Sequence, residues 1–298
     1  NTIGPVWDLN ETWVIVAGAC LFAAFPEWYA TLFSGFYLPL LLILLALILR
    51  GVSFEYRHQR EGLAWKRGFD RMIVIGSVIP ALLWGVAFGN IVQGVPIDAD
   101  KNVTGSLLTL LNPYALCVGA TTLLLFFLHG LYFVGLKADG TVKEEAHRLA
   151  RRVALPTIAF AAATVVWTTV IAMDREAPAL AAVIGCGVAA ALALLGSAVA
   201  NLRRRDGWAF ALGAVTIVGA VLMLWFALFP YVMPSSTDPA NSLTIENASS
   251  TDYTLTVMTW AAVIFLPGIL AYQAWTYWVF RKRISRVQIE KADAAAAH

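Results

Sequence analysis

Long uninterrupted apolar segments constrain this chain more than any other feature of its sequence. Residues 38–49, for example, contain no polar side chain at all. A helix needs about 20 apolar residues to cross a hydrocarbon core about 30 Å thick. Runs with neither helical amphipathicity nor strand alternation are typical of helices that face lipid or lie inside a membrane bundle. We therefore predict an all-α integral membrane protein, a polytopic helical bundle that forms one transmembrane domain over residues 1–298. The eight expected spans are 10–32, 37–56, 71–94, 113–136, 146–173, 178–202, 208–232 and 253–280.

The composition supports the same fold class. Of the 298 residues, 59% are hydrophobic and only 13% are charged. A soluble domain of this size usually carries about 25% charged residues. So few charges cannot cover a water-facing surface, which excludes a soluble globular protein, a disordered chain and a nucleic-acid-binding protein. The three cysteines are isolated in apolar segments without a CxxC spacing, so we expect no disulfide framework and no metal site.

The loop charges predict one orientation in the membrane. Basic residues concentrate in 57–71, 137–152, 203–205 and 281–286, whereas acidic residues dominate the loops between them. The positive-inside rule places the basic set in the cytoplasm, together with both visible termini. The longest outer loop, 233–252, leaves room for a short structured turn and for no soluble catalytic module. Any chemistry must therefore take place within the bilayer or on a partner.

The start of the chain holds a candidate proton-handling group. Asp8 and Glu11 are three residues apart, so on a helix they share a face and lie about 5–6 Å apart. Two carboxylates so close at the edge of lipid cannot both ionise cheaply, and one would relay protons from the cytoplasm. The same spacing is also typical of a capping-box-like helix start, with Asp8 accepting from free N–H groups. The two roles are compatible.

A charged residue inside the second predicted span is a further candidate. Counting helical rise from the turn near residue 35 places Arg50 about 10 Å deeper in the membrane than Glu11. An arginine at this depth must extend to the interface or pair with an acid or a carbonyl of a neighbouring helix. We expect a structural anchor there. The predicted charge cluster comprises Arg50, Glu55, Arg57 and Asp70.

His129 is the one histidine expected inside a span, since we assign His58, His147 and His298 to loops or the tail. A lone histidine can be an axial haem ligand or a metal ligand. A hydrogen-bonded interior histidine is the alternative that we favour. Without a second histidine in a span, this chain has no pair to ligate a bis-histidine haem.

Small residues predict close helix packing. Gly85 and Gly89 form a G-x-x-x-G match, and Asn90 follows at once. Such a stretch lets two helix backbones approach closely and hydrogen-bond across the contact. The partner helix would belong either to this chain or to another membrane protein.

Several motifs together resemble one known family. They are VWDLNETW at 6–13, FSGFYLPL at 33–40, RGV with FEYR at 50–57, LNPYAL at 111–116 and YQAW at 272–275. In this order they resemble the smaller subunit, subunit II, of cytochrome bd quinol oxidase. The resemblance covers nearly the whole chain and is weaker between about 150 and 230.

The resemblance implies a function for the chain and roles for named residues. It implies a heterodimer in the bacterial cytoplasmic membrane, whose larger subunit binds two haems b and one haem d. That subunit would oxidise quinol and reduce dioxygen to water, and the reaction would generate a proton-motive force. This chain would be a non-haem subunit, not catalytic alone and with no metal of its own, and the family also allows a structural quinone and a small single-span accessory subunit. Asp8 matches an aspartate at the cytoplasmic mouth of a proton path, and Trp7 and Glu11 belong to the same motif. Arg50 and Asp70 match positions whose charge supports assembly or haem retention.

Two departures from the family pattern concern the start of the chain. The family fold has nine spans, as two four-helix bundles plus one helix, so we expect the first helix to be missing from this sequence. Leu9 stands where the family motif usually has Gly.

The alternative function is a multi-helix secondary transporter or channel, which would have broken midplane helices and polar substrate groups. The sequence shows few midspan prolines and no polar midplane cluster.

Overall fold

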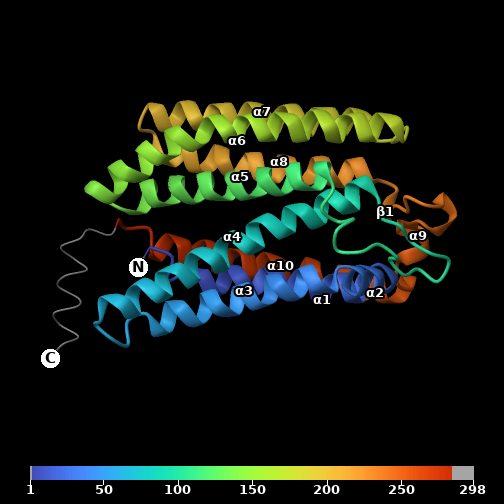
Figure 1. Cartoon of the computed structure of the whole chain (residues 1–298), viewed down its shortest axis with the longest axis horizontal. Coiled ribbons are helices and arrows are strands. Elements are labelled where there is room, and N and C mark those ends of the chain that lie inside the picture. Colours follow the sequence, from blue (N-terminus) through green and yellow to red (C-terminus); the bar gives the residue numbers. More distant parts are fainter. Residues whose placement is uncertain (1, 284–298) are drawn as a thin grey trace.

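The computed structural model of the chain describes residues 2–283 and is almost entirely helical (Figure 1). Arg286 and His298 lie outside the described residues. Two short strands and one 3-10 helix interrupt the helices near one end of the molecule. The helices are α1 (Trp7–Ala24), α2 (Pro26–Gly35), α3 (Tyr37–Tyr56), α4 (Leu63–Gln93), α5 (Pro113–Lys137), α6 (Thr141–Asp174), α7 (Leu180–Leu202), α8 (Asp206–Leu228), α9 (Ile245–Ala248) and α10 (Asp252–Val279).

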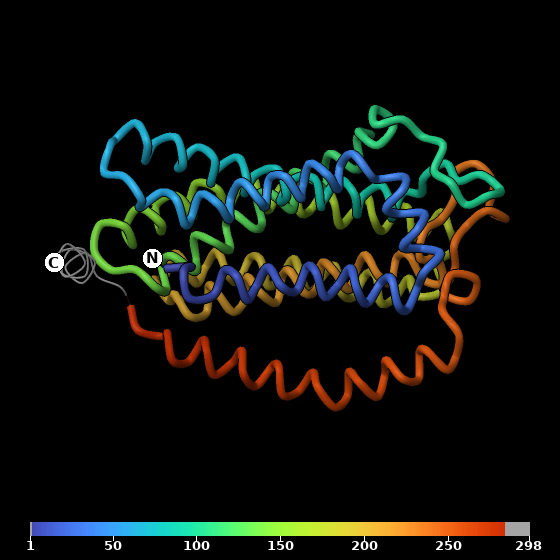
Figure 2. The backbone as a smooth tube through the Cα atoms, turned by 90° about the horizontal axis from the view of Figure 1, so that it is seen from below, coloured from blue at the N-terminus to red at the C-terminus, as the bar shows by residue number. Residues whose placement is uncertain are grey.

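The long helices run side by side along one axis. α5, α6, α7 and α8 pack against one another as a bundle, and the α3–α4 hairpin joins it through α4. Figure 2 shows α10 running along the outside, apart from the other helices for most of its length. In agreement with this view, α10 has no buried residue. We call the end that holds the loops 57–62, 138–140 and 203–205 the basic end of the bundle.

The predicted fold class is confirmed, but the predicted number of spans is wrong. Within residues 2–283, seven helices are long and apolar enough to cross a membrane, namely α3 to α8 and α10. The expected span 10–32 is divided, because Phe25 leaves helical geometry at φ −136° and Pro26 begins α2. Proline lacks an N–H group and suits the first position of a new helix. Polar residues in the first turns of α1 also lower its mean hydropathy.

The G-x-x-x-G stretch packs within the chain, against α5. A Cβ atom on Gly85 would lie 2.7 Å from Gly119 Cα, and one on Gly89 would lie 2.7 Å from Ala115 Cα. Beside this contact the buried Asn90 side chain donates a 2.6 Å hydrogen bond to the carbonyl of Leu110. The alternative in which these glycines contact another membrane protein is therefore wrong.

The end opposite the basic end is closed by a small structured loop. α8 ends at Leu228, before the 232 expected, and Pro230 follows it at a position where a helix cannot continue unbroken. Strand β1 (Tyr231–Met233) then pairs antiparallel with β2 (Leu243–Thr244). Gly94, with φ of +92°, ends α4 and lets the amide of Val95 donate to the Pro234 carbonyl at 3.1 Å.

Candidate functional site

The first turn of α1 carries the residues predicted to handle protons. α1 begins at Trp7, and its N-cap is Val6, whose side chain offers no oxygen to the free N–H groups. Asp8 therefore lies inside the first turn, and its side chain is exposed. An acidic group there interacts favourably with the positive end of the helix dipole. The capping role expected for Asp8 is wrong, because the helix begins one residue before it.

Trp7 and Glu11 lie four residues apart on one face of α1, and this face contacts α3. The Trp7 ring packs against Phe54 with ring centroids 5.2 Å apart. One turn further on, Glu11 Oε1 accepts a hydrogen bond from Nη2 of Arg50. The two side chains are 26% and 23% exposed, so the pair is partly shielded from solvent. The structure thus joins a residue of the predicted proton path to one of the predicted charge cluster.

This contact contradicts the 10 Å depth difference expected between Glu11 and Arg50. That estimate assumed one straight helix over residues 10–32. The break at Phe25 changes the course of α1, and the long arginine side chain covers the remaining distance.

Arg50 is held close to α4 on its other side. A Cβ atom on Gly76 of α4 would lie 2.8 Å from the Cβ of Arg50 and 2.5 Å from the carbonyl oxygen of Ala46. Only a glycine fits such an approach of two helix backbones. The Nε atom of Arg50 is buried and has no hydrogen-bond partner among residues 2–283. Glu11 is therefore the group that offsets the charge of this guanidinium within the described part of the chain.

The remaining residues of the predicted charge cluster do not join Arg50. Arg57, just after α3, binds Asp70 of α4 through a fork of two hydrogen bonds, 2.6 Å and 3.3 Å long. The hydrogen bond to Asp70 raises the pKa of the Arg57 guanidinium above its ordinary value. Glu55 is exposed and forms no ion pair with any described residue. The expected single cluster is in fact two separate pairs, and Glu55 belongs to neither.

A contact between α1 and α10 was not anticipated. The amide of Asn10 donates a 2.9 Å hydrogen bond to the Tyr277 hydroxyl, which in turn donates to Asn10 Oδ1 at 3.0 Å. Asn10 belongs to the VWDLNETW motif, so its position gave a signal that sequence reasoning did not use. The contact places α10 beside the start of α1.

A second polar cluster, also missed, lies at the basic end around Asp206, the first residue of α8. Its carboxylate is buried, with Lys143 Nζ at 2.8 Å and Arg283 Nη2 at 3.0 Å from Oδ2. His147 Nε2 lies 3.0 Å from Oδ1, and its Nδ1 lies 2.7 Å from Asn201 Oδ1. The assignment of His147 to a loop is wrong, since it is buried in α6. This cluster joins α6 and α8 directly, α7 through Asn201, and the segment after α10 through Arg283.

His129 of α5 is packed and not hydrogen-bonded at Nδ1. Its ring stacks on Phe210 with centroids 4.5 Å apart. Nδ1 is buried, rests against Gly213 and has no hydrogen-bond partner within the described residues. The expectation of a hydrogen-bonded histidine is therefore not met at this atom. Over residues 2–283, no three His, Cys, Asp or Glu side chains gather as a metal site would require.

Comparison with known proteins gives a consistent result over nearly the whole chain. Residues 1–280 match the family model of cytochrome bd terminal oxidase subunit II. The chain is 39% identical to cytochrome bd ubiquinol oxidase subunit 2 of Bacillus subtilis, covering 96% of this chain and 84% of that protein. It is 37% identical to cytochrome bd-I ubiquinol oxidase subunit 2 of Escherichia coli K12, covering 98% and 85%.

The fold is also found in a solved structure. A chain in the structure of bd oxidase from Geobacillus thermodenitrificans superimposes with a TM-score of 0.69 at 19% identity. The match covers 93% of this chain and 84% of that one. At this identity the likeness concerns the fold alone.

Proposed function

Because this chain belongs to the cytochrome bd terminal oxidase subunit II family, we propose that it is the non-haem subunit of a membrane quinol:oxygen oxidoreductase. It is a transmembrane subunit of a respiratory oxidoreductase complex in the bacterial cell membrane. The observation that carries the proposal is the family match over residues 1–280, together with the seven helices able to span a bilayer in the described part of the chain.

We assign the haems of the complex to the larger partner subunit. Among the histidines described here, His147 does not fit an axial ligand, and His129 could offer only its Nε2 atom. Both ring nitrogens of His147 face side-chain oxygens, at 2.7 Å and 3.0 Å, and Nδ1 of His129 is enclosed against Gly213. His58 lies exposed in the loop after α3. The role left to this chain is to support the haem-bearing subunit and to guide protons.

The proposed proton path begins at Asp8. Its exposed carboxylate at the start of α1 can take up a proton from water at the basic end. Glu11 follows one turn deeper, and Arg50 holds its Oε1 atom in place. Oε2 accepts no hydrogen bond from a described residue, so this oxygen is open to a proton or to a water molecule. Trp7 packs on Phe54 and forms an apolar wall beside the two carboxylates.

The charge distribution supports the orientation that such a path requires. The basic loops would face the cytoplasm by the positive-inside rule, and the start of α1 lies at the same end (Figure 1). Asp8 would then draw protons from the cytoplasm. Their consumption in the reduction of dioxygen would contribute to a proton-motive force.

The proposed function is tested by expressing this chain with and without its larger partner. We expect a haem-bearing membrane protein to co-purify, with a haem d band in its reduced-minus-oxidised spectrum and quinol-driven oxygen uptake that requires both chains. Purification of this chain free of any haem protein when both chains are expressed, or transport of a solute by this chain alone, would overturn the proposal.

A further inference from the structure

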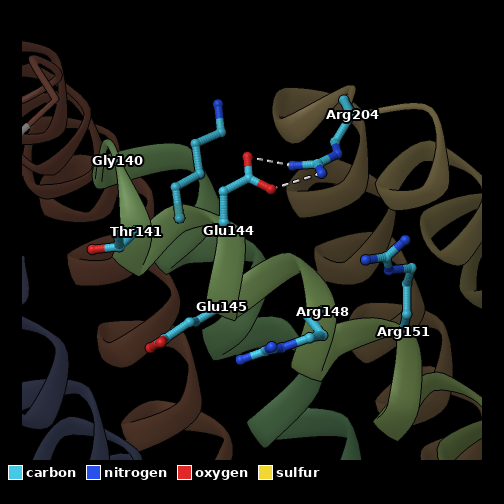
Figure 3. A pocket seen from close by; sticks show the side chains of 8 residues that line it. Gly140, Thr141, Glu144, Glu145, Arg148, Arg151 and Arg204 are labelled. Carbon is cyan, nitrogen blue, oxygen red and sulfur yellow. Dashed lines mark hydrogen bonds and ion pairs between the residues drawn. The ribbon is translucent and has the colours of Figure 1, made fainter.

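A cationic hollow lies at the basic end of the bundle and is lined by none of the α1 residues. It has a volume of about 950 Å³ and is open to the outside. Figure 3 shows the side chains that line it, most of them from the first turns of α6, with Arg204 from the loop after α7. Its charged lining residues are Lys143, Glu144, Glu145, Arg148, Arg151 and Arg204.

Two of the cations in this hollow are neutralised and two are not. Arg204 binds Glu144 through two hydrogen bonds of 2.7 Å, and Lys143 pairs with Asp206 at 2.8 Å. Arg148 and Arg151 are exposed and form no ion pair with any residue between 2 and 283. They lie three residues apart on one face of α6, and Figure 3 shows their side chains extending in different directions; a change of side-chain conformation would bring both guanidinium groups to the same anion. Glu145 also lines the hollow, exposed and without an ion-pair partner among the described residues, so the lining is left with an excess of positive charge that favours a negatively charged group.

The same face of α6 continues as an apolar stripe. Helical spacing places Arg148, Arg151 and Leu155 in one row along α6. Val166 lies in the same row, three turns beyond Leu155. Leu155 is 74% exposed and Val166 is 64% exposed, and the alanines 159 and 162 between them are exposed as well. A soluble anion would gain nothing from this stripe, whereas an acyl chain would lie along it.

From these two observations we infer that the hollow binds the phosphate headgroup of an anionic phospholipid. Arg148 and Arg151 bind the phosphate oxygens, because the planar guanidinium fork matches a phosphate bidentately. The acyl chains cover the stripe that begins at Leu155. Basic pockets between transmembrane helices commonly bind anionic lipid headgroups. The Glu144–Arg204 pair forms the opposite wall and connects α6 to the loop after α7.

The test uses the intact oxidase complex in detergent, with lipid retention measured by native mass spectrometry. Phosphatidylglycerol is the probe and phosphatidylcholine is the neutral comparison. We expect R148Q/R151Q to retain phosphatidylglycerol more weakly by on the order of tenfold, because each basic residue contributes several-fold to anionic lipid binding. The charge-conserving R148K/R151K variant should retain most of the binding. E144Q releases Arg204 from its partner and should strengthen retention.

A matched control removes the same charge at the same end of the bundle. R60Q/R67Q also eliminates two exposed cations, one of which stacks on Trp65, and neither lines the hollow. We expect this variant to retain the lipid as the unmodified complex does. Equal retention by R148Q/R151Q and the unmodified complex would overturn the inference, and so would equal losses in R148Q/R151Q and R60Q/R67Q. Retention of inorganic phosphate by the unmodified complex, without retention of phosphatidylglycerol, would overturn the assignment to a lipid in favour of a soluble anion.

Discussion

Glu11 of α1 and Arg50 of α3 form an ion pair at the side of the bundle where α1 meets the α3–α4 hairpin. The pair links two helices that otherwise meet chiefly through the Trp7 and Phe54 rings. Gly76 lets α4 approach Arg50 closely on the side away from Glu11. Arg50 therefore belongs to α3, lies against α4 and pairs with α1. This ion pair therefore helps to seat the start of α1, together with the Trp7–Phe54 packing and the Asn10–Tyr277 hydrogen bonds.

Substitution of Arg50 tests the importance of this pair for assembly. Arg50→Leu leaves the Glu11 carboxylate without its partner in a partly shielded position. We expect a loss of about 1 to 2 kcal/mol in stability, since both side chains are about a quarter exposed. The thermal midpoint of the complex and its haem content per protein should both fall.

The double variant Glu11→Leu/Arg50→Leu provides the control for Arg50→Leu. It removes both charges together, so part of the lost stability should return. Full haem occupancy and an unchanged thermal midpoint in Arg50→Leu would rule out an anchoring role for this pair.

Substitution of Asp8 tests the proton path separately from assembly. In Asp8→Asn the amide cannot take up and release a proton as a carboxyl group does. We expect quinol-driven oxygen uptake and membrane-potential generation to fall about tenfold or more, while the subunits stay together because Asp8 is exposed. Oxygen uptake by proteoliposomes with a potential-sensitive dye measures both quantities.

Two variants accompany Asp8→Asn. Asp8→Glu keeps a carboxyl group and should retain most of the activity. Glu61→Gln removes an exposed carboxylate from the loop between α3 and α4, at the same end of the bundle, and should leave turnover unchanged. Unaltered turnover and proton uptake in Asp8→Asn would contradict a relay role for Asp8.

Hydropathy and helix rise account for much of this fold but not for its local breaks. The apolar run before Arg50 predicted a helix over 37–56, the residues that α3 occupies. The first span was treated as one straight helix although Pro26 lies within it, and proline often begins a new helix. That oversight produced both the wrong number of spans and the wrong depth of Arg50 relative to Glu11.

Side-chain pairing across distant helices was the part that the sequence did not reveal. Nothing in the local sequence of His147 or Asp206 indicates that they meet, since they lie 59 positions apart and belong to different helices. Asp206 directly follows three arginines and so resembles an ordinary loop acid. It is buried among cations because α6 packs against α8 and because Arg283, which follows α10, reaches its carboxylate.

Substitution of Asp206 tests this buried cluster. Asp206→Asn leaves the charges of Lys143 and Arg283 without a carboxylate at a site that is 7% exposed. Loss of one partner of a buried pair is strongly destabilising, so we expect a cost on the order of 3 kcal/mol and a lower thermal midpoint. Faster hydrogen exchange should follow at the end of α10, which Arg283 helps to hold.

Asp139→Asn is the matched control for Asp206→Asn. Asp139 also pairs with Arg283, but at 3.4 Å and with both side chains more than 40% exposed. An exposed pair of this kind contributes at most about 1 kcal/mol. Equal destabilisation by the two variants would show that burial does not set the importance of Asp206.

The last prediction concerns the close contact between α4 and α5. Gly89→Ala places a Cβ atom 2.7 Å from the backbone Cα of Ala115, which cannot move aside as a flexible side chain would. The helices must separate, and we expect a destabilisation of about 1 to 3 kcal/mol, as is typical of overpacking. Thermal unfolding followed by tryptophan fluorescence measures it.

Gly185→Ala makes the same chemical change where there is space. Nothing lies within 4 Å of a Cβ atom at Gly185 in α7, so the higher helix propensity of alanine should leave stability unchanged or slightly increased. The two variants differ only in what the added methyl group meets. If Gly89→Ala proves as stable as Gly185→Ala, the α4 and α5 backbones do not approach each other closely at Gly89, and the packing described here is incorrect at that point.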